Sequence, residues 1–262
     1  MKKTKIIIVF LIILFLSLST YLFFITTSKP FQQENMTIFN NANNFYQQKE
    51  YNKSILLYKL LINKGITNAD IYYNLANSYY KNKQFAEALV NYKNAEILAP
   101  RNADIKANIK FIIDQYTNND EAIKPTYQTI LFWYHYLNLE ELIKLTIITS
   151  LLVCSIGVIY IFYKHVLTSS LFYIGIIILI TLFLSTFIKI YKNYNYSEGI
   201  ITKNSGLLKS GNNESFSTLG NLVLGDEVKI LEKKGNWYKI KLNNDKKGWA
   251  NKHYVSLIDA HM

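Results

Sequence analysis

The chain has 262 residues, half of them hydrophobic, and a formal net charge of +11. This length suits about two domains. Lysines are mixed with acidic residues along the chain, so we expect a solvated surface and no nucleic-acid partner. The single cysteine, Cys154, excludes an internal disulfide and a CxxC redox or zinc pair, and we expect no metal and no cofactor. The aliphatic residues are concentrated in three blocks, near 6–27, 145–163 and 171–188.

The N-terminus has the layout of an export signal. The basic sequence MKKTK at residues 1–5 precedes an apolar run that extends to Thr27. Ser17-Leu18-Ser19 offers a cleavage site, whereas the continuation of the run through Ile25 suits an uncleaved anchor. Both readings stay open for residues 1–29, as signal peptide or signal anchor, and both direct residue 30 and onward out of the cytoplasm.

Residues 35–116 contain an internal repeat of 34 residues. The shift aligns Ala42 with Ala76 and Tyr58 with Tyr92. In the first copy, Asn41 stands where leucine is expected. The second copy, residues 69–102, fits the tetratricopeptide pattern, and the next helix, predicted at 103–116, would cap the stack. The positions that fit this pattern are Tyr72, Leu75, Ala76, Tyr79, Ala88, Tyr92, Ala95 and Pro100.

Tetratricopeptide stacks usually bind peptides on the concave face formed by the first helix of each repeat. The side chains predicted to face such a peptide are neutral amides and aromatic rings, which suit an extended or helical polypeptide. An alternative is that so short a stack only packs against the rest of the protein or a neighbour. The predicted peptide-binding residues are Phe39, Asn43 and Tyr46 in the first copy and Tyr73, Asn77 and Tyr80 in the second.

Residues 125–144 are predicted to form an interfacial amphipathic segment. Trp133, Tyr134 and Tyr136 precede the second apolar block, and such rings favour the headgroup layer of a membrane. A helix is expected to begin at Asn138. His135 has no second histidine, cysteine or paired carboxylate near it in the sequence, so no metal or catalytic role is expected for it.

Residues 145–188 are predicted to form a transmembrane hairpin. Two apolar runs, 145–163 and 171–188, approach the roughly 20 residues that a spanning helix needs, and residues 164–170 connect them. Neither run contains a charged residue, which argues against a transport path. A hairpin leaves its two flanks on the same side, and the leader favours the extracytoplasmic side of a bacterial cytoplasmic membrane. Flanking lysines, Lys144 and Lys189 among them, oppose this orientation weakly, so the cytosolic alternative stays open.

Residues 199–258 change to short apolar runs with a period of two, such as 228–231 and 237–242, separated by Gly and Asn turns. This pattern predicts a small antiparallel barrel. The sequences Leu208-Lys209-Ser210-Gly211, Gly235-Asn236-Trp237-Tyr238 and Lys247-Gly248-Trp249-Ala250 resemble the motifs of bacterial SH3-like domains. The resemblance implies binding of cell-wall peptides or protein segments. Trp237, Trp249 and Tyr254 are the candidate groove residues, and Trp249 and Tyr254 suit the core equally well.

The order of these segments resembles the BatE family of aerotolerance-operon proteins. The resemblance rests on the repeat at 69–102, on FWYHYLNLEELIKL at 132–145 and on the tail GNWYKIKL…KGWANKHYV. The weak first repeat and the long leader depart from the family pattern. Membership would imply a stress or aerotolerance system with MoxR-type ATPases, and membrane proteins bearing von Willebrand A domains as partners.

We therefore predict a multidomain membrane protein with a helical repeat domain, a two-helix hairpin and an all-β SH3-like barrel. We see no Ser/His/Asp or Cys/His set, no metal-ligand spacing and no phosphate loop in the sequence, so we expect no enzyme. The leading hypothesis is a membrane-anchored scaffold for protein–protein interactions. The alternative is a wall-binding sensor or anchor whose SH3-like domain binds peptidoglycan.

Overall fold

The computed structural model describes residues 33–116, 132–163, 165–195, 197–203 and 206–258. The expected leader at 1–29 and residues 125–131 of the expected interfacial segment lie outside these ranges. The chain divides into two compact units. One unit contains the hairpin and the short helix just before it, and the other contains the helices within residues 33–116 together with the strands after the hairpin. The predicted combination of a helical repeat region, two apolar helices and a C-terminal antiparallel sheet is confirmed.

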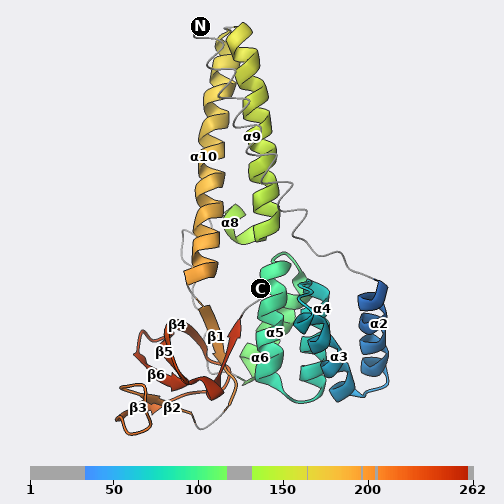
Figure 1. Cartoon of the computed structure of the whole chain (residues 1–262), viewed down its shortest axis with the longest axis vertical. Helices are drawn as coiled ribbons and strands as arrows, with labels where there is room; N and C mark the ends of the chain where they lie inside the picture. Colours follow the sequence, from blue (N-terminus) through green and yellow to red (C-terminus); the bar gives the residue numbers. More distant parts are fainter. Residues whose placement is uncertain (1–32, 117–131, 164, 196, 204–205, 259–262) are drawn as a thin grey trace. The chain divides into compact units, whose positions relative to one another are not determined.

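Five helices form the repeat region, and each packs against the next one in the chain (Figure 1). The helix predicted at 103–116 is present as α6, which has these bounds, and its role as the cap of the stack stays a prediction. Pro100 follows the end of α5, where the chain cannot continue the helix. The five helices are α2 (Gln33–Gln47), α3 (Tyr51–Asn63), α4 (Ala69–Lys81), α5 (Phe85–Leu98) and α6 (Ala103–Tyr116).

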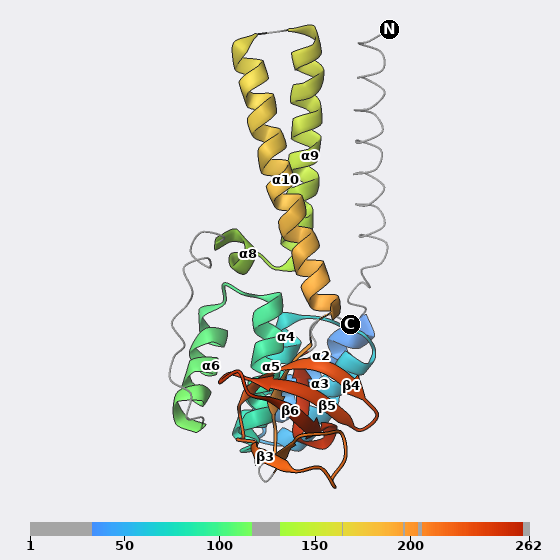
Figure 2. The same cartoon turned by 90° about the vertical axis from the view of Figure 1, so that its left-hand side faces the viewer.

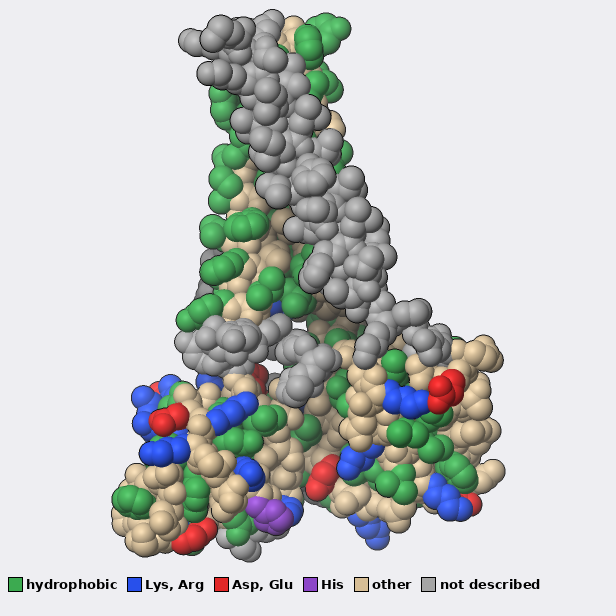
Figure 3. All heavy atoms as spheres, viewed as in Figure 1, with side chains coloured by type: hydrophobic (Ala, Val, Ile, Leu, Met, Phe, Trp, Pro, Cys, Tyr) green, Lys and Arg blue, Asp and Glu red, His purple; other side chains and the backbone are tan. Residues whose placement is uncertain are grey.

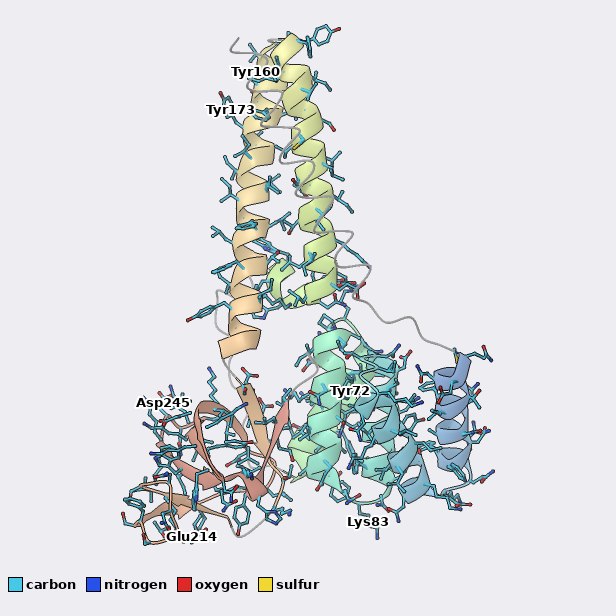
Figure 4. The ribbon with its side chains drawn as sticks, in the orientation of Figure 1. Tyr72, Lys83, Tyr160, Tyr173, Glu214 and Asp245 are labelled. Atoms are coloured by element: carbon cyan, nitrogen blue, oxygen red, sulfur yellow. The ribbon has the colours of Figure 1, made fainter. Side chains whose placement is uncertain are left out.

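The turns within the two repeats have the same backbone geometry. Lys49 and Lys83, 34 residues apart, both have a φ of 62°. The amide after each lysine donates a 2.9 Å hydrogen bond back to a carbonyl of the preceding helix. This left-handed turn reverses the chain between the helices of each pair, although lysine has to adopt a conformation that glycine adopts more easily. Figure 4 shows Lys83 at this turn.

Small side chains allow the repeat helices to approach one another. Ala76 and Ala88 are fully buried, as the repeat pattern predicted. Ser54 occupies in the first repeat the position that Ala88 occupies in the second. Its hydroxyl lies 2.9 Å from that of Ser78, and both serines are buried. The first repeat therefore accommodates a polar side chain at this position because a hydrogen bond satisfies it.

Two long antiparallel helices form the hairpin: α9 (Leu139–Phe162) and α10 (Val166–Asn195) (Figure 2). Both are long and apolar enough to cross a membrane. Only 28% of the apolar stretch of α9 and 17% of that of α10 is buried, unlike the mostly buried core helix of a soluble protein. Figure 3 shows hydrophobic side chains along their visible surface. α10 begins within the segment 164–170 that we expected to be the connection, because the hydroxyls of Ser169 and Ser170 bond the Val166 carbonyl in the first turn.

α9 buries a stripe of small and aliphatic residues that includes Ser150, Val153 and Gly157, and Val153 lies against α10. A Cβ atom at Gly175 of α10 would lie 2.9 Å from Val153 Cγ2. Near the turn, the rings of Tyr160 and Phe172 stack with centroids 5.7 Å apart. Figure 4 labels Tyr160 in this region, together with Tyr173.

The start of α9 is fixed by a capping box, which confirms the helix start predicted at Asn138. Its side chain accepts a 2.8 Å bond from the Glu141 amide, and Glu141 accepts a 3.0 Å bond from the Asn138 amide. The short helix α8 (Phe132–Tyr136) precedes this cap and lies near the end of the hairpin opposite its turn (Figure 2). Lys189 of α10 donates 2.6 Å and 3.0 Å bonds to the carbonyls of Leu137 and Tyr134, which ties α8 to α10.

A seven-stranded antiparallel sheet follows the hairpin, with the order β3-β2-β6-β5-β4-β1-β7. The strands predicted at 228–231 and 237–242 lie within β4 and β5. Ile240 and Ala250 are fully buried in the core of this domain, and Tyr238 and Leu242 pack against that core. The strands are β1 (Ser197–Ile201), β2 (Leu207–Lys209), β3 (Thr218–Asn221), β4 (Glu227–Lys234), β5 (Trp237–Leu242), β6 (Lys247–Asn251) and β7 (Val255–Ile258), with a 3₁₀ turn, η1 (Lys252–Tyr254), before β7.

Candidate interaction surfaces

The six predicted peptide-binding residues lie on α2 and α4, the first helices of the two repeats, and all six are partly exposed. Two of them, Asn43 and Asn77, form hydrogen bonds inside the repeat. The hydroxyl of Tyr92 on α5 donates to Asn77 Oδ1 over 2.5 Å. The hydroxyl of Tyr58 on α3 donates to Asn43 Oδ1 in the same way. These amides therefore position the second helix of each repeat.

Hydrogen bonds of the same kind link one repeat to the next. Asn74 donates a 3.2 Å bond to Asn43 Oδ1, which joins α4 to α2. Asn108 on α6 lies 34 residues after Asn74, and its amide donates to the hydroxyls of Tyr92 at 3.2 Å and Tyr73 at 3.5 Å. We did not select Asn108 from the sequence. The sequence does point to Asn108, because this residue lies one repeat period after Asn74.

Aromatic side chains continue along the same helices. The rings of Tyr73 and Tyr92 lie 5.8 Å apart, centroid to centroid. Tyr80 packs its ring edge-on against Phe111 of α6, with centroids 6.0 Å apart, and Phe111 keeps half of its surface exposed. We call the set of Tyr73, Tyr80, Asn108 and Phe111 the aromatic–amide face. It spans α4 and α6 and carries no formal charge.

The hydroxyls of Tyr92 and Tyr46, near this face, remain protonated at ordinary pH. Burial raises the pKa of Tyr92 above its usual value, and the neighbouring Tyr73, Tyr46 and Tyr80 raise it further. Burial also raises the pKa of Tyr46, followed in effect by Tyr51 and Tyr73. These residues therefore act as neutral donors and acceptors. Such groups bind polar backbone atoms and apolar side chains in preference to ions.

In the β domain, Trp237 and Trp249 lie on one face of the sheet. Trp237 pairs with Asn251 across β5 and β6, and Lys239 pairs with Trp249. Residues of one strand two places apart share a face, so both tryptophans lie opposite the face that carries Ile240. Lys239 Nζ lies 5.9 Å from the centroid of the Trp249 ring, within reach of a cation–π contact.

The third predicted groove residue, Tyr254, lies elsewhere. It belongs to η1 and packs against the core cluster of the domain. A Cβ atom at Gly206 would lie 2.9 Å from Tyr254 Cγ, so this ring lies closely against the chain just before β2. Trp237 and Trp249 therefore share one face, but Trp237 is buried at 9% exposure and Trp249 is partly exposed, while Tyr254 packs against the core.

In the part of the chain that the structure describes, no cluster of three or more His, Cys, Asp or Glu side chains could hold a metal ion. The pKa of His135 lies below its ordinary value because of partial burial and the positive charges of Lys189 and Lys192.

Comparison with known families agrees with both folded modules. Residues 205–256 match the family model of the bacterial SH3 domain, and residues 69–102 match that of the tetratricopeptide repeat. No curated protein was found to match the chain. The repeat indicates protein–protein interaction, and the bacterial SH3 domain indicates binding to the cell wall. Both are typically non-catalytic interaction modules.

Proposed function

We propose that this protein is a non-catalytic scaffold anchored in the bacterial cytoplasmic membrane. In this proposal α9 and α10 span the membrane, and the repeats and the SH3-like domain lie on the extracytoplasmic side. The repeats bind a segment of a protein partner. The SH3-like domain contacts the same partner or the wall.

The observation that carries the proposal is the aromatic–amide face. Tyr73, Tyr80 and Asn108 are partly exposed and Phe111 is half exposed, so a ligand can reach all four. Tyrosine and phenylalanine supply large contact area at a small cost in side-chain entropy, which is why aromatic residues are frequent at protein interfaces. The four side chains are neutral and favour a polypeptide segment with apolar side chains, and Lys81 Nζ lies beside them, 6.0 Å from the centroid of the Tyr80 ring.

The resemblance to BatE proteins supplies the context for this scaffold. The full set of segments follows that family's order, which suggests a Bat/MoxR-type stress or aerotolerance system. Membrane proteins with von Willebrand A domains are the partners that this context suggests. The basic residues before the first apolar run favour the extracytoplasmic side for the folded domains.

Co-purification from detergent-solubilised membranes tests the scaffold. The Tyr73→Ala/Tyr80→Ala variant should lose a partner that wild type retains. Leu56→Ala is the matched control, because Leu56 is 66% exposed on α3 and lies outside the aromatic–amide face. The proposal is wrong if the double variant co-purifies with every protein that wild type retains.

A second candidate function is wall binding by the SH3-like domain, favoured by the partly exposed pair of Lys239 and Trp249. Sugar rings and wall peptides pack against tryptophan, and a nearby lysine attracts carboxylates of the wall peptide. The full-length protein in detergent should sediment with purified wall sacculi, and Trp249→Ala should reduce the bound fraction. Leu231→Ala, at a 43% exposed position on β4, is the control. Equal sedimentation of wild type and Trp249→Ala would exclude this face as the wall site.

A further inference from the structure

The helix α5 has a face that the other repeat helices leave uncovered. The first repeat provides an internal reference, because α3 occupies there the place that α5 occupies in the second. Leu56 and Leu60 on α3 are 66% and 41% exposed, whereas Val90 and Asn94, 34 residues later on α5, are 7% and 5% exposed. The next helix in the chain does not explain this difference in exposure. α3 is covered by the helix that follows it, α4, just as α5 is covered by α6.

The β domain explains the difference. Among the described repeat helices, α5 is the one with extensive contacts to β1 and β7. Ile200 of β1 is fully buried, in the same cluster as Val90 and Leu89, and Ile258 of β7 packs against that cluster. The two modules that the family models match separately thus share one hydrophobic core. Figure 1 shows the β1–β7 edge of the sheet next to the repeat helices.

An ion pair crosses the same contact. Lys93 of α5 reaches Glu227 of β4 at 2.9 Å and Glu96 of its own helix at 3.8 Å. The Lys93 side chain is 21% exposed. Burial alone would lower its pKa, but attraction to Glu227 and Glu96 outweighs this effect and raises the pKa. Lys93 is therefore charged in the contact, and a charge that is largely removed from water requires its partner.

The contact joins parts of the chain that lie on either side of the hairpin in the sequence. Residues 31–131 and 193–262 belong to one compact unit, while α9 and most of α10 belong to the other. We propose that the repeats and the SH3-like domain form one discontinuous domain, docked through α5 against β1 and β7, into which the apolar hairpin is inserted. This proposal is independent of any partner and of the side of the membrane on which the domain lies.

Two consequences follow. The chain between residues 131 and 193 crosses a membrane an even number of times, because both ends enter the same folded domain. The β1–β7 edge is also closed to ligands, since α5 covers it. A ligand of the SH3-like domain would then bind at another face, such as that of Lys239 and Trp249.

Carbodiimide crosslinking of the full-length protein in detergent tests the docking. This reagent joins a lysine amine to a carboxylate only where the two are in direct contact. Wild type should give a peptide linking Lys93 to Glu227. Lys93→Glu and Glu227→Lys should each lose this link, and the double variant should restore it with the charges exchanged. Lys59→Glu, at the matching position of the first repeat, should leave it intact.

The link must also form within one chain. A mixture of isotopically labelled and unlabelled protein should give no mixed crosslinked peptide. Absence of the link in wild type, or a link that is formed mainly between chains, would overturn the proposal.

If the two modules share one core, a change that opens the contact on α5 should also expose β1 and β7. Hydrogen exchange measures this coupling. Val90→Asp should raise the exchange rates of amides in β1 and β7 by about tenfold or more, since a buried carboxylate would open the contact. Leu56→Asp, at the exposed equivalent on α3, should leave these rates within about twofold of wild type. Unchanged protection of β1 and β7 in Val90→Asp would show that the modules are independent and would overturn the proposal.

Discussion

The hydroxyl of Tyr92 donates a 2.5 Å hydrogen bond to Asn77, and Tyr58 makes the equivalent bond to Asn43 one repeat earlier. Each bond joins the second helix of a repeat to its first. Both tyrosines are buried, and both asparagines are only partly exposed. The Tyr92–Asn77 pair ties α5 to α4, and Asn108 of α6 donates to the same Tyr92 hydroxyl, so the stability of the second repeat and the shape of the aromatic–amide face depend on the same groups.

Removal of one of these hydroxyls should destabilise the repeats. Tyr92→Phe leaves the ring in place but leaves Asn77 without this donor, at an expected cost of about 1–2 kcal/mol in the free energy of unfolding. Tyr58→Phe should cost a similar amount. Urea denaturation followed by circular dichroism measures both. Tyr79→Phe is the control and should stay within about 0.5 kcal/mol of wild type; an equal loss there would mean that the hydroxyl bonds have no special weight.

The same tyrosines predict a loss of stability at alkaline pH. Burial raises the pKa of Tyr58 and Tyr92 above the ordinary value of 10.0. In the unfolded chain these hydroxyls ionise near pH 10, so the folded state retains more protons above that pH. The free energy of unfolding should therefore be unaffected by these groups below about pH 10 and should fall as the pH rises further, through the raised folded-state pKa values.

Each group should contribute about 1.4 kcal/mol per pH unit in that range. Denaturation at a series of pH values measures the slope, which should be smaller in the Tyr58→Phe/Tyr92→Phe variant. A slope that the double substitution does not change would contradict this assignment.

The left-handed lysines at the repeat turns predict stabilising substitutions. Lys49 and Lys83 both have a φ of 62°, a conformation that glycine adopts at little cost. Lys83→Gly should raise the free energy of unfolding by about 0.5–1 kcal/mol, and Lys49→Gly should do the same. Lys64 ends α3 with a φ of −73°, so Lys64→Gly is the matched control and should lower stability. A loss of stability in all three variants would contradict the backbone argument.

The close approach of α9 and α10 at Gly175 predicts a specific suppressor. Gly175→Val would bring a branched side chain against Val153 and should destabilise the hairpin by about 1–3 kcal/mol. Val153→Ala opens this space, so the double variant should recover part of the loss. Thermal unfolding in detergent measures the three proteins. If the stability losses of the two single variants simply add in the double variant, these two residues are not in contact.

Local patterns in the sequence predict much of this fold. Spacing of apolar residues placed α6 correctly, and the asparagine at 138 with a glutamate three residues later predicted the start of α9. Period-two alternation located β4 and β5. The connection of the hairpin was predicted too long, because Ser169 and Ser170 are polar and yet satisfy their hydroxyls within the first turn of α10.

Contacts between distant residues were not predictable from one sequence. The repeat period places Lys93 and Val90 on the outside of the stack, like Lys59 and Leu56, and nothing local indicates that β1 covers them. Asn108 was accessible through the repeat period alone. The sequence suits Tyr254 equally to a groove and to the core. Its packing against Gly206 depends on a chain segment almost 50 positions away.

The central claim is that the aromatic–amide face holds a protein partner. The most direct measurement is photo-crosslinking in living cells, with a photoreactive residue placed at Tyr80, at Phe111 or, as a control, at Leu60 on α3. The scaffold account predicts that Tyr80 and Phe111 capture the same protein, that Tyr73→Ala abolishes this capture, and that Leu60 does not capture it. Failure of Tyr80 and Phe111 to capture a common protein, or equal capture of that protein from Leu60, would contradict the account.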